Sequence, residues 1–298
     1  MLRRFPYWIA LWPCLVWAQD DALPAYVLLL PPSVQSVLIA ETDTATLHRY
    51  EAGPNGLAPA DEQRMSVGEN GVGKQTTGDR RTPLGIYFVL EELDTSNLHE
   101  KYGPVAFPLD YPNAWDLRNN RSGHGIWIHG VAPGSGPRPE RDTDGCIALQ
   151  NESLLELSNY LAPTETPVIV TRSLERTSRA EIVRTRDRLL VVLQTWADSY
   201  RDGDWHQYLS LYADDFAYRG MSRTEWSTYR MQSAGDRPVS DFAVDEIMLL
   251  TDPVESGLYV SRFRQKTAES GRLITITKRL YWRETGSGEL RIVAEDNG

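Results

Sequence analysis

Short apolar runs between proline, glycine and polar residues constrain the fold of this chain more than any other feature. The runs are too short for a typical helix and long enough for a strand. In the N-terminal half they predict strands at 26–30, 36–40, 46–50, 64–68, 86–90, 125–129 and 166–170, the third pairing back on the second as a hairpin. An amphipathic helix is predicted at 151–161, and 102–120, rich in proline, asparagine and aromatic residues, is predicted to be a long ordered loop. This half should therefore be mostly β.

The C-terminal half has a different order of elements. Helical patterns come first, at about 178–200, 205–216 and 223–231. Segments typical of strands follow at 239–250, 258–267, 273–284 and 290–295, separated by polar and glycine-bearing turns. Helices followed by an antiparallel sheet predict an α+β domain. The charge-rich segment that begins at Thr171 has no recurring apolar positions until Ile182, so we place the domain boundary near residue 175.

The first 18 residues resemble a secretory signal peptide. Arg3 and Arg4 precede an apolar run at 5–16, and Ala18 supplies a small residue at the cleavage site. The run is too short to span a bilayer, so we predict export to the periplasm without stable membrane insertion. About 280 mature residues exceed the usual size of one core. We therefore predict a signal peptide at 1–18, a first domain at 19–175 and a second domain at 176–298.

The predicted mature chain is acidic. Removal of residues 1–18 deletes two arginines and no acids, which leaves 29 basic against 41 acidic side chains. The excess lies in the first domain, where residues 19–172 hold 11 Lys and Arg against 21 Asp and Glu. No basic stripe is present that could follow a phosphate backbone, so we predict that nucleic acid is not a partner.

One segment of the first domain combines the residues of a cysteine nucleophile site. His129-Gly130 ends a short apolar run, and Gly145-Cys146 follows in the same segment. With Cys14 removed in the signal peptide, Cys146 is the one cysteine left and cannot form an intrachain disulfide. An imidazole near a thiol is the usual way to generate a thiolate near neutral pH. The Gly130 carbonyl can fix the histidine tautomer, and the N–H groups of Gly145 and Cys146 can stabilise an oxyanion.

A zinc site is the main alternative for these residues, with Cys146, His129, His124 and Asp144 as ligands. If 125–129 is a strand, His124 and His129 lie five positions apart and point to opposite faces. The remaining set has no standard zinc spacing, so we predict no metal and no cofactor. The glycine-rich stretch around Lys74 lacks the Gly-Lys-Ser/Thr ending of a phosphate loop.

Three blocks of sequence resemble the signature motifs of the YkuD-type L,D-transpeptidases. They are Gly78-Asp-Arg-Arg-Thr-Pro-Leu-Gly-Ile-Tyr87, Gly125-Ile-Trp-Ile-His-Gly130 and Thr143-Asp-Gly-Cys-Ile147. The resemblance covers about residues 24–172. The segments Tyr111-Pro-Asn113…Asp116 and Gly145-Cys-Ile-Ala-Leu149 are most similar to the YafK-like branch of that family.

The resemblance implies a mostly β catalytic domain whose cysteine takes an acyl group from a peptidoglycan stem peptide. Cys146 would be the nucleophile, His129 the base, and Gly145 with Cys146 the oxyanion donors, with Gly130 part of the site. We predict substrate contacts at Arg80, Arg81, Tyr111 and Asp144. The family often has His just before the Gly-Cys pair and Arg two positions after the cysteine, where this chain has Asp144 and Ala148.

The second domain resembles the SnoaL-like cone, the fold shared with nuclear transport factor two. The resemblance rests on the aromatic residues of 196–216, on Ser222-Arg-Thr-Glu-Trp226 and on the four strands that follow. The predicted fold is therefore a mostly β catalytic domain followed by an α+β cone domain with a curved antiparallel sheet. Such a cone has a concave apolar pocket, and we expect the domain to be accessory.

The predicted function is that of an exported L,D-transpeptidase that cross-links or remodels the cell wall, with a role in cell shape. The predicted partner is the peptidoglycan stem peptide, and a wall-attached lipoprotein is a second one. One alternative is a hydrolase of the same family type that releases wall-bound lipoprotein. The other is a non-catalytic peptidoglycan-binding scaffold. A low-pKa Cys146 thiol would favour an enzyme over the scaffold.

Overall fold

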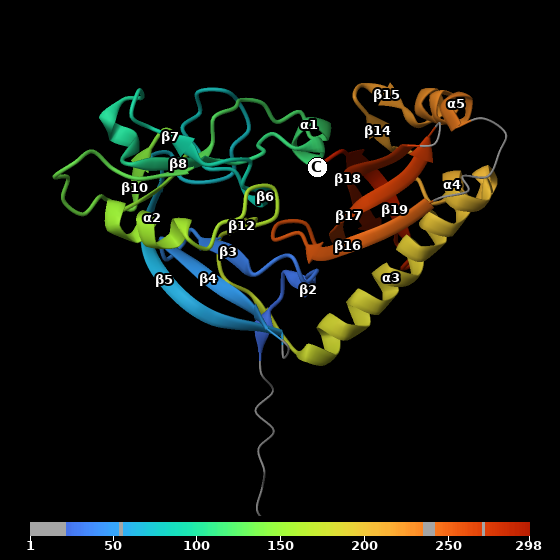
Figure 1. Cartoon of the computed structure of the whole chain (residues 1–298), viewed down its shortest axis with the longest axis horizontal. Helices are drawn as coiled ribbons and strands as arrows, with labels where there is room; N and C mark the ends of the chain where they lie inside the picture. Colours follow the sequence, from blue (N-terminus) through green and yellow to red (C-terminus); the bar gives the residue numbers. More distant parts are fainter. Residues whose placement is uncertain (1–21, 54–55, 235–241, 270–271) are drawn as a thin grey trace, which may run out of the picture.

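The computed structural model describes residues 22–53, 56–234, 242–269 and 272–298, which form two lobes side by side (Figure 1). The predicted signal peptide at 1–18 lies outside the described residues, as do the first three residues of the strand predicted at 239–250. Within the described residues, no helix is both long and apolar enough to cross a membrane.

A ten-stranded mixed sheet forms the first lobe. Its order is β6-β12-β3-β4-β5-β11-β9-β8-β7, and β10 pairs with β5. These strands are β3 (Ser36–Glu41), β4 (Thr46–Gly53), β5 (Gly56–Gly68), β6 (Gly85–Phe88), β7 (Leu93–Asp94), β8 (Val105–Pro108), β9 (Trp127–His129), β10 (Arg141–Thr143), β11 (Ile147–Leu149) and β12 (Pro167–Thr171). The short helices of this lobe are η1 (Glu100–Tyr102), α1 (Ala114–Arg118) and α2 (Asn151–Ser158). The predicted hairpin is confirmed, because β3 pairs antiparallel with β4 from Ser36↔Glu51 to Glu41↔Thr46.

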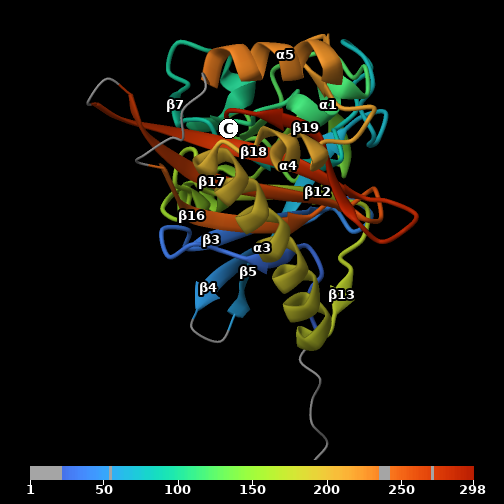
Figure 2. The ribbon, with the colours of Figure 1, turned by 90° about the vertical axis from the view of Figure 1, so that its right-hand side faces the viewer.

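A curved antiparallel sheet forms the second lobe, as the sequence predicted (Figures 1 and 2). It has five strands, one more than predicted, because β2 joins it from the segment assigned to the first domain. Its order is β19-β18-β17-β16-β2, with β2 (Val27–Leu29), β16 (Phe242–Thr251), β17 (Leu258–Glu269), β18 (Arg272–Glu284) and β19 (Leu290–Asp296). Two small sheets pair β1 (Leu23–Pro24) with β13 (Arg176–Thr177) and β14 (Ala217–Tyr218) with β15 (Met221–Ser222). The helices are α3 (Arg179–Asp202), α4 (Trp205–Ser210) and α5 (Arg223–Ala234).

Helix α3 shows why this sequence forms a long helix at this place. The Ser178 side chain accepts a hydrogen bond from the backbone N–H of Glu181, and Gly203 ends the helix in a left-handed conformation at φ 71°. Leu189, Leu193 and Trp196 recur at helical spacing and are buried against the curved sheet, which α3 crosses in Figure 2.

Strand β2 belongs to the sheet of the second lobe although it lies near the start of the described chain. It pairs antiparallel with β16, with Leu29 opposite Leu249 and Val27 opposite Leu250. The segment before β3 therefore crosses from one lobe to the other. The division of the chain at residue 175 stays a prediction, and this strand crosses it.

The two lobes also share a hydrophobic core. One buried cluster joins Ile39 and Ile86 of the first sheet to Leu250 and Tyr281 of the second, with the Trp115 ring stacked on Tyr281 at a centroid distance of 6.3 Å. Ion pairs cross the same interface. Arg279 pairs with Asp110, Arg118 with Asp215, and Arg264 with Glu165.

The prediction that 102–120 is a loop was wrong in part. Strand β8 is buried in the first sheet, and the short helix α1 begins at a capping box in which Asn113 and Asp116 each accept a hydrogen bond from the other's backbone N–H. Strand β8 has four residues and ends at Pro108, so it is too short for a clear period in the sequence.

Candidate active site

Cys146 lies in a tight turn between β10 and β11. Gly145 has φ 123°, and a Cβ at this position would lie 2.7 Å from the Arg81 carbonyl oxygen. The Thr143 hydroxyl stabilises the turn, because it accepts the Gly145 N–H at 3.1 Å and donates to the Cys146 carbonyl at 2.7 Å. The turn thus requires glycine before the cysteine for both conformational and steric reasons.

His129 ends β9, the strand beside β11. The two strands run parallel, with Ile147 opposite Ile128 and Ala148 opposite His129, so the cysteine turn and the histidine belong to adjacent strands. Both side chains line one cavity of about 340 Å³. Strand pairing therefore brings together two residues that are distant in sequence.

The protonation of His129 follows from its surroundings. The residue is 4 % exposed, and this burial lowers the pKa of the imidazole to about 4, so the ring is neutral near pH 7. Its Nδ1 lies 2.7 Å from the Gly130 carbonyl oxygen, which can only accept, so Nδ1 carries the proton. Nε2 is therefore left as a proton acceptor. The prediction that the Gly130 carbonyl fixes the tautomer agrees with this contact.

The Cys146 thiol is buried and is not a ready-made thiolate. Burial raises the pKa of this thiol, and the backbone N–H of Trp127, which bonds to the sulfur, opposes that rise. Sγ lies 3.4 Å from the Gly125 carbonyl oxygen, an acceptor for the thiol proton. The low thiol pKa that we associated with an enzyme is absent in this resting geometry. A thiolate would have to form as the sulfur attacks a substrate.

The Gly145 amide does not fit the prediction of a free oxyanion donor. Its N–H donates to the Thr143 hydroxyl, so it is already engaged. Gly130 has a structural reason to be glycine, because a Cβ there would lie 2.3 Å from Asn151 Oδ1 and 3.0 Å from Pro104 Cδ. The same Asn151 oxygen accepts the N–H of Val131 at 2.8 Å and fixes the chain just after His129.

The four predicted substrate contacts are not grouped in one place. Asp144 lines the cavity and pairs with Lys101 at 3.5 Å and with Arg80 at 3.7 Å. Arg80 therefore lies near the cavity edge. Arg81 lines a different cavity. Tyr111 is a clear error, because it is 5 % exposed in the core, and its hydroxyl donates to the Ser122 carbonyl at 3.0 Å.

Several lining residues were not identified from the sequence. Lys101 and Tyr102 contribute from η1, and the Tyr102 ring meets the His129 ring edge to face at a centroid distance of 5.2 Å. Lys74 also lines the cavity, and its 4 % exposed side chain pairs with Asp79 at 2.7 Å. Neither the glycine-rich loop around Lys74 nor the supposed loop at 102–120 carries a pattern indicating that the two meet near a thiol.

The structure shows where the four candidate zinc ligands lie. His124, His129, Asp144 and Cys146 all line the cavity. Yet in the part of the chain that the structure describes, no three His, Cys, Asp or Glu residues are grouped closely enough to hold a metal ion.

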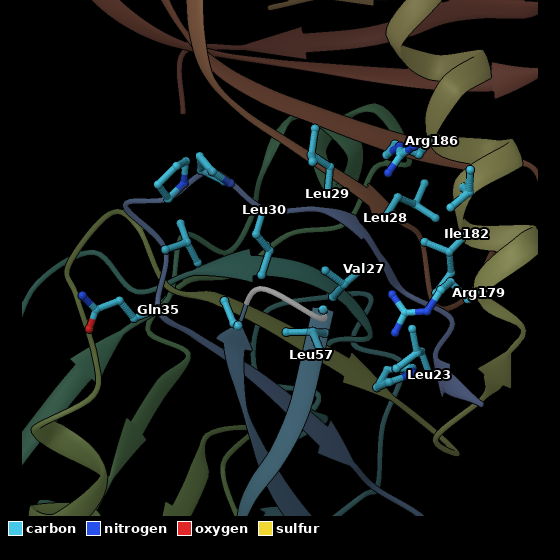
Figure 3. A pocket seen from close by; sticks show the side chains of 18 residues that line it. Leu23, Val27, Leu28, Leu29, Leu30, Gln35, Leu57, Arg179, Ile182 and Arg186 are labelled. Carbon is cyan, nitrogen blue, oxygen red and sulfur yellow. The ribbon is translucent and has the colours of Figure 1, made fainter. Parts of the chain in front are cut away.

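A second cavity, of about 630 Å³, lies between the N-terminal strands and α3 (Figure 3). Leu23, Val27, Leu57 and Ile182 give it a mostly apolar wall, with Arg179 at one side. None of the described residues that line it is a cysteine, histidine or carboxylate. It therefore lacks the chemistry found around Cys146.

Comparison with known proteins gives matches for both halves of the chain. Residues 39–170 match the family model of the YkuD L,D-transpeptidase catalytic domain, and residues 188–296 match that of the Cds6 C-terminal NTF2-like domain. No curated protein matches the chain.

Solved structures similar to the whole chain include two bacterial proteins. Bdellovibrio bacteriovorus Bd1075 matches with a TM-score of 0.74 and 22% identity, over 93% of this chain and 98% of that one. The helical cell shape determining protein Pgp2 from Campylobacter jejuni matches with a TM-score of 0.74 and 22% identity, over 94% and 96% of the two chains. At this identity the likeness concerns the fold, and it includes the order of the two domains.

Proposed function

Since the chain carries a YkuD L,D-transpeptidase catalytic domain at 39–170 followed by an NTF2-like domain at 188–296, we propose that it is an exported enzyme that transfers acyl groups of peptidoglycan stem peptides. The observation on which this proposal rests is the shared cavity of Cys146 and His129, in which the imidazole is neutral and its Nε2 is free to accept a proton.

In the proposed first step, Sγ of Cys146 attacks a stem-peptide carbonyl while Nε2 of His129 takes the thiol proton. The Cys146 N–H is the oxyanion donor that we retain, since the Gly145 N–H is bonded to Thr143. The C–N bond then breaks, the imidazolium gives its proton to the leaving amine, and an acyl thioester remains on Cys146. Because Cys146 and His129 are both neutral at rest, charge develops on them only while the sulfur attacks.

In the proposed second step, an amine of another stem peptide attacks the thioester while His129 takes its proton. The new amide forms, the C–S bond breaks, and the proton returns to the sulfur. Water in place of the amine gives hydrolysis, the outcome required for release of a wall-bound lipoprotein. We propose transfer as the main reaction, in the periplasm. Because the Campylobacter neighbour is a helical cell shape determining protein, we further propose that this reaction serves the control of cell shape.

The test is to incubate the chain without residues 1–18, and its Cys146→Ala variant, with purified wall sacculi and to identify the products by mass spectrometry. We expect new cross-links made only by the wild type. Released peptides would instead indicate the hydrolase. Circular dichroism of both proteins controls for folding.

The same assay addresses the scaffold. If neither protein changes sacculi of several compositions, while both bind them, the enzyme proposal is wrong and the chain is a wall-binding scaffold.

A further inference from the structure

Three arginines converge on a small cavity that is separate from the cavity of Cys146. Arg81, Arg141 and Arg172 line this space of about 200 Å³, together with Asp43 and Asn70. We call it the arginine pocket. Its arginines come from three places in the first lobe: the loop before β6, the start of β10 and the residue after β12.

The charges of the first domain make this grouping unusual. Residues 19–172 hold 11 basic side chains among 21 acidic ones, and all 11 belong to the described residues. The other eight each pair with a carboxylate within 3.5 Å. Among the described residues, Arg81, Arg141 and Arg172 have no carboxylate at ion-pair distance. The three unpaired cations of an acidic domain thus share one cavity.

Two of these exposed side chains lie against the backbone around the pocket. Arg81 donates from Nη1 to the Val72 carbonyl at 3.2 Å. The Arg141 guanidinium lies against Gly71, where a Cβ would be 3.8 Å from Cζ. Guanidinium groups are suited to an oxyanion, since their planar N–H donors bind carboxylate or phosphate in pairs.

The arginine pocket and the cavity of Cys146 share a wall. In β10, Arg141 lines the pocket and the next residue, Asp142, lines the cavity, as expected from the alternation of side chains along a strand. Likewise, Asn70 lines the pocket and its neighbour Glu69 lines the cavity. In addition, the carbonyl of Arg81 lies against Gly145, next to the thiol. The pocket and the cavity therefore lie on opposite sides of strand β10, one residue apart in sequence.

We propose that the arginine pocket binds the carboxylate of an amino-acid end group on a peptidoglycan stem peptide. The proposal rests on the proposed function for the identity of the polymer. The volume suits one small group rather than a sugar ring. Asp43 adds a negative charge to the lining, which disfavours a phosphate dianion and favours an ammonium group next to the carboxylate.

The experiment uses the chain with Cys146→Ala, so that binding is measured without turnover. Isothermal titration calorimetry with a disaccharide tetrapeptide, at low and high salt, compares this protein with one that also has Arg141→Gln and Arg172→Gln. We expect the double substitution to weaken binding at least tenfold and to reduce its salt dependence. Arg64→Gln is the matched control, because Arg64 is exposed and pairs with Glu140 on the same domain.

Each other outcome contradicts the proposal. Equal affinity of the double variant and its parent would show that the pocket does not bind the peptide. An equal loss of affinity in Arg64→Gln would show that the loss comes from the change in net charge. Competition by inorganic phosphate at lower concentration than by meso-diaminopimelate identifies a phosphate site instead. The binding assay needs no catalysis. The proposal for the arginine pocket can therefore be correct even if the wild type leaves sacculi unchanged, and the enzyme proposal can be correct even if the pocket binds no peptide.

Discussion

Burial controls the protonation of both residues in the candidate active site. It lowers the pKa of His129 and raises the pKa of Cys146, so both groups are neutral at rest. An uncharged pair costs less to keep in a closed cavity than a thiolate–imidazolium pair would. In the proposed reaction, charge would therefore develop on the two groups only when the sulfur attacks a substrate carbonyl.

The His129 pKa predicts a pH dependence of stability. A folded-state pKa of about 4, against an ordinary 6.5, means that the unfolded chain binds the proton first as the pH falls. The stabilisation is complete above pH 6.5 and is lost towards pH 4, by roughly 3 kcal/mol in total. His129→Gln should remove this slope, as measured by urea unfolding between pH 7 and pH 4.

Asp252 acts in the opposite direction over part of the same range. Burial raises the pKa of this carboxyl to about 6, so its contribution to stability is lost as the pH rises from 3.8 through 6. Wild type and His129→Gln both contain Asp252. The difference between their pH dependences of stability therefore reports on the histidine alone. Equal slopes for the two proteins would show that His129 is not buried in the neutral form.

At the scale of elements, the turn between β10 and β11 places the thiol. It combines a left-handed glycine, a hydroxyl bridge from Thr143 and close contact with the Arg81 carbonyl. A side chain at residue 145 would push the turn away from the loop before β6. The thiol would move with it, because Cys146 follows directly.

We therefore expect Gly145→Ala to destabilise the protein more than Gly134→Ala does. Gly134 has φ 76° and no atom within 4 Å of an added Cβ, so its substitution has only the conformational cost of about 1–2 kcal/mol. The clash at Gly145 should add at least about 1 kcal/mol. Urea unfolding measures both, and only Gly145→Ala should also abolish turnover of sacculi. Equal losses for the two variants would mean that the turn can relax.

Local sequence patterns predicted most elements of the fold. Period, caps and turn residues act over a few positions, as at Ser178 and Gly203, and they located α3 and the strands of the curved sheet. The two residues of the thiol–imidazole pair were also named, since both lie next to glycines in short distinctive motifs. The predictions failed where a short element depends on distant partners, as β8 does.

The site contacts that were missed are also long-range. Lys74 reaches the cavity from a loop and Lys101 from η1, and neither sequence indicates a partner. Tyr111 was chosen for its motif, but it packs edge to face on Tyr87 at a centroid distance of 5.8 Å inside the core. A motif identifies which residues matter without separating those that line a cavity from those that support it.

At the scale of the whole molecule, Arg279 connects the two lobes. Its side chain is 5 % exposed and pairs with Asp296 in its own sheet at 2.7 Å and with Asp110 in the first lobe. The other oxygen of Asp296 accepts the N–H of Ala114 at the start of α1, at 3.2 Å. The interface is therefore built around a buried cation with two acidic partners.

Removing this cation should strongly destabilise the protein. Arg279→Gln leaves two partly buried carboxylates without their partner, and we expect a loss of about 3 kcal/mol in the free energy of unfolding. The exposed pair of Arg291 and Glu289 is the control, since Arg291→Gln should cost less than about 1 kcal/mol. Similar urea midpoints for the two variants would show that the lobes do not depend on Arg279.

Strand β2 determines the order in which the molecule can be completed. Leu29 is made early in synthesis, but its partner Leu249 is made only after the helices α3, α4 and α5. Until then, the growing chain presents an unpaired strand edge, which can pair with other chains. A chain interrupted before β16 would contain both His129 and Cys146. It would still lack the strand with which β2 pairs.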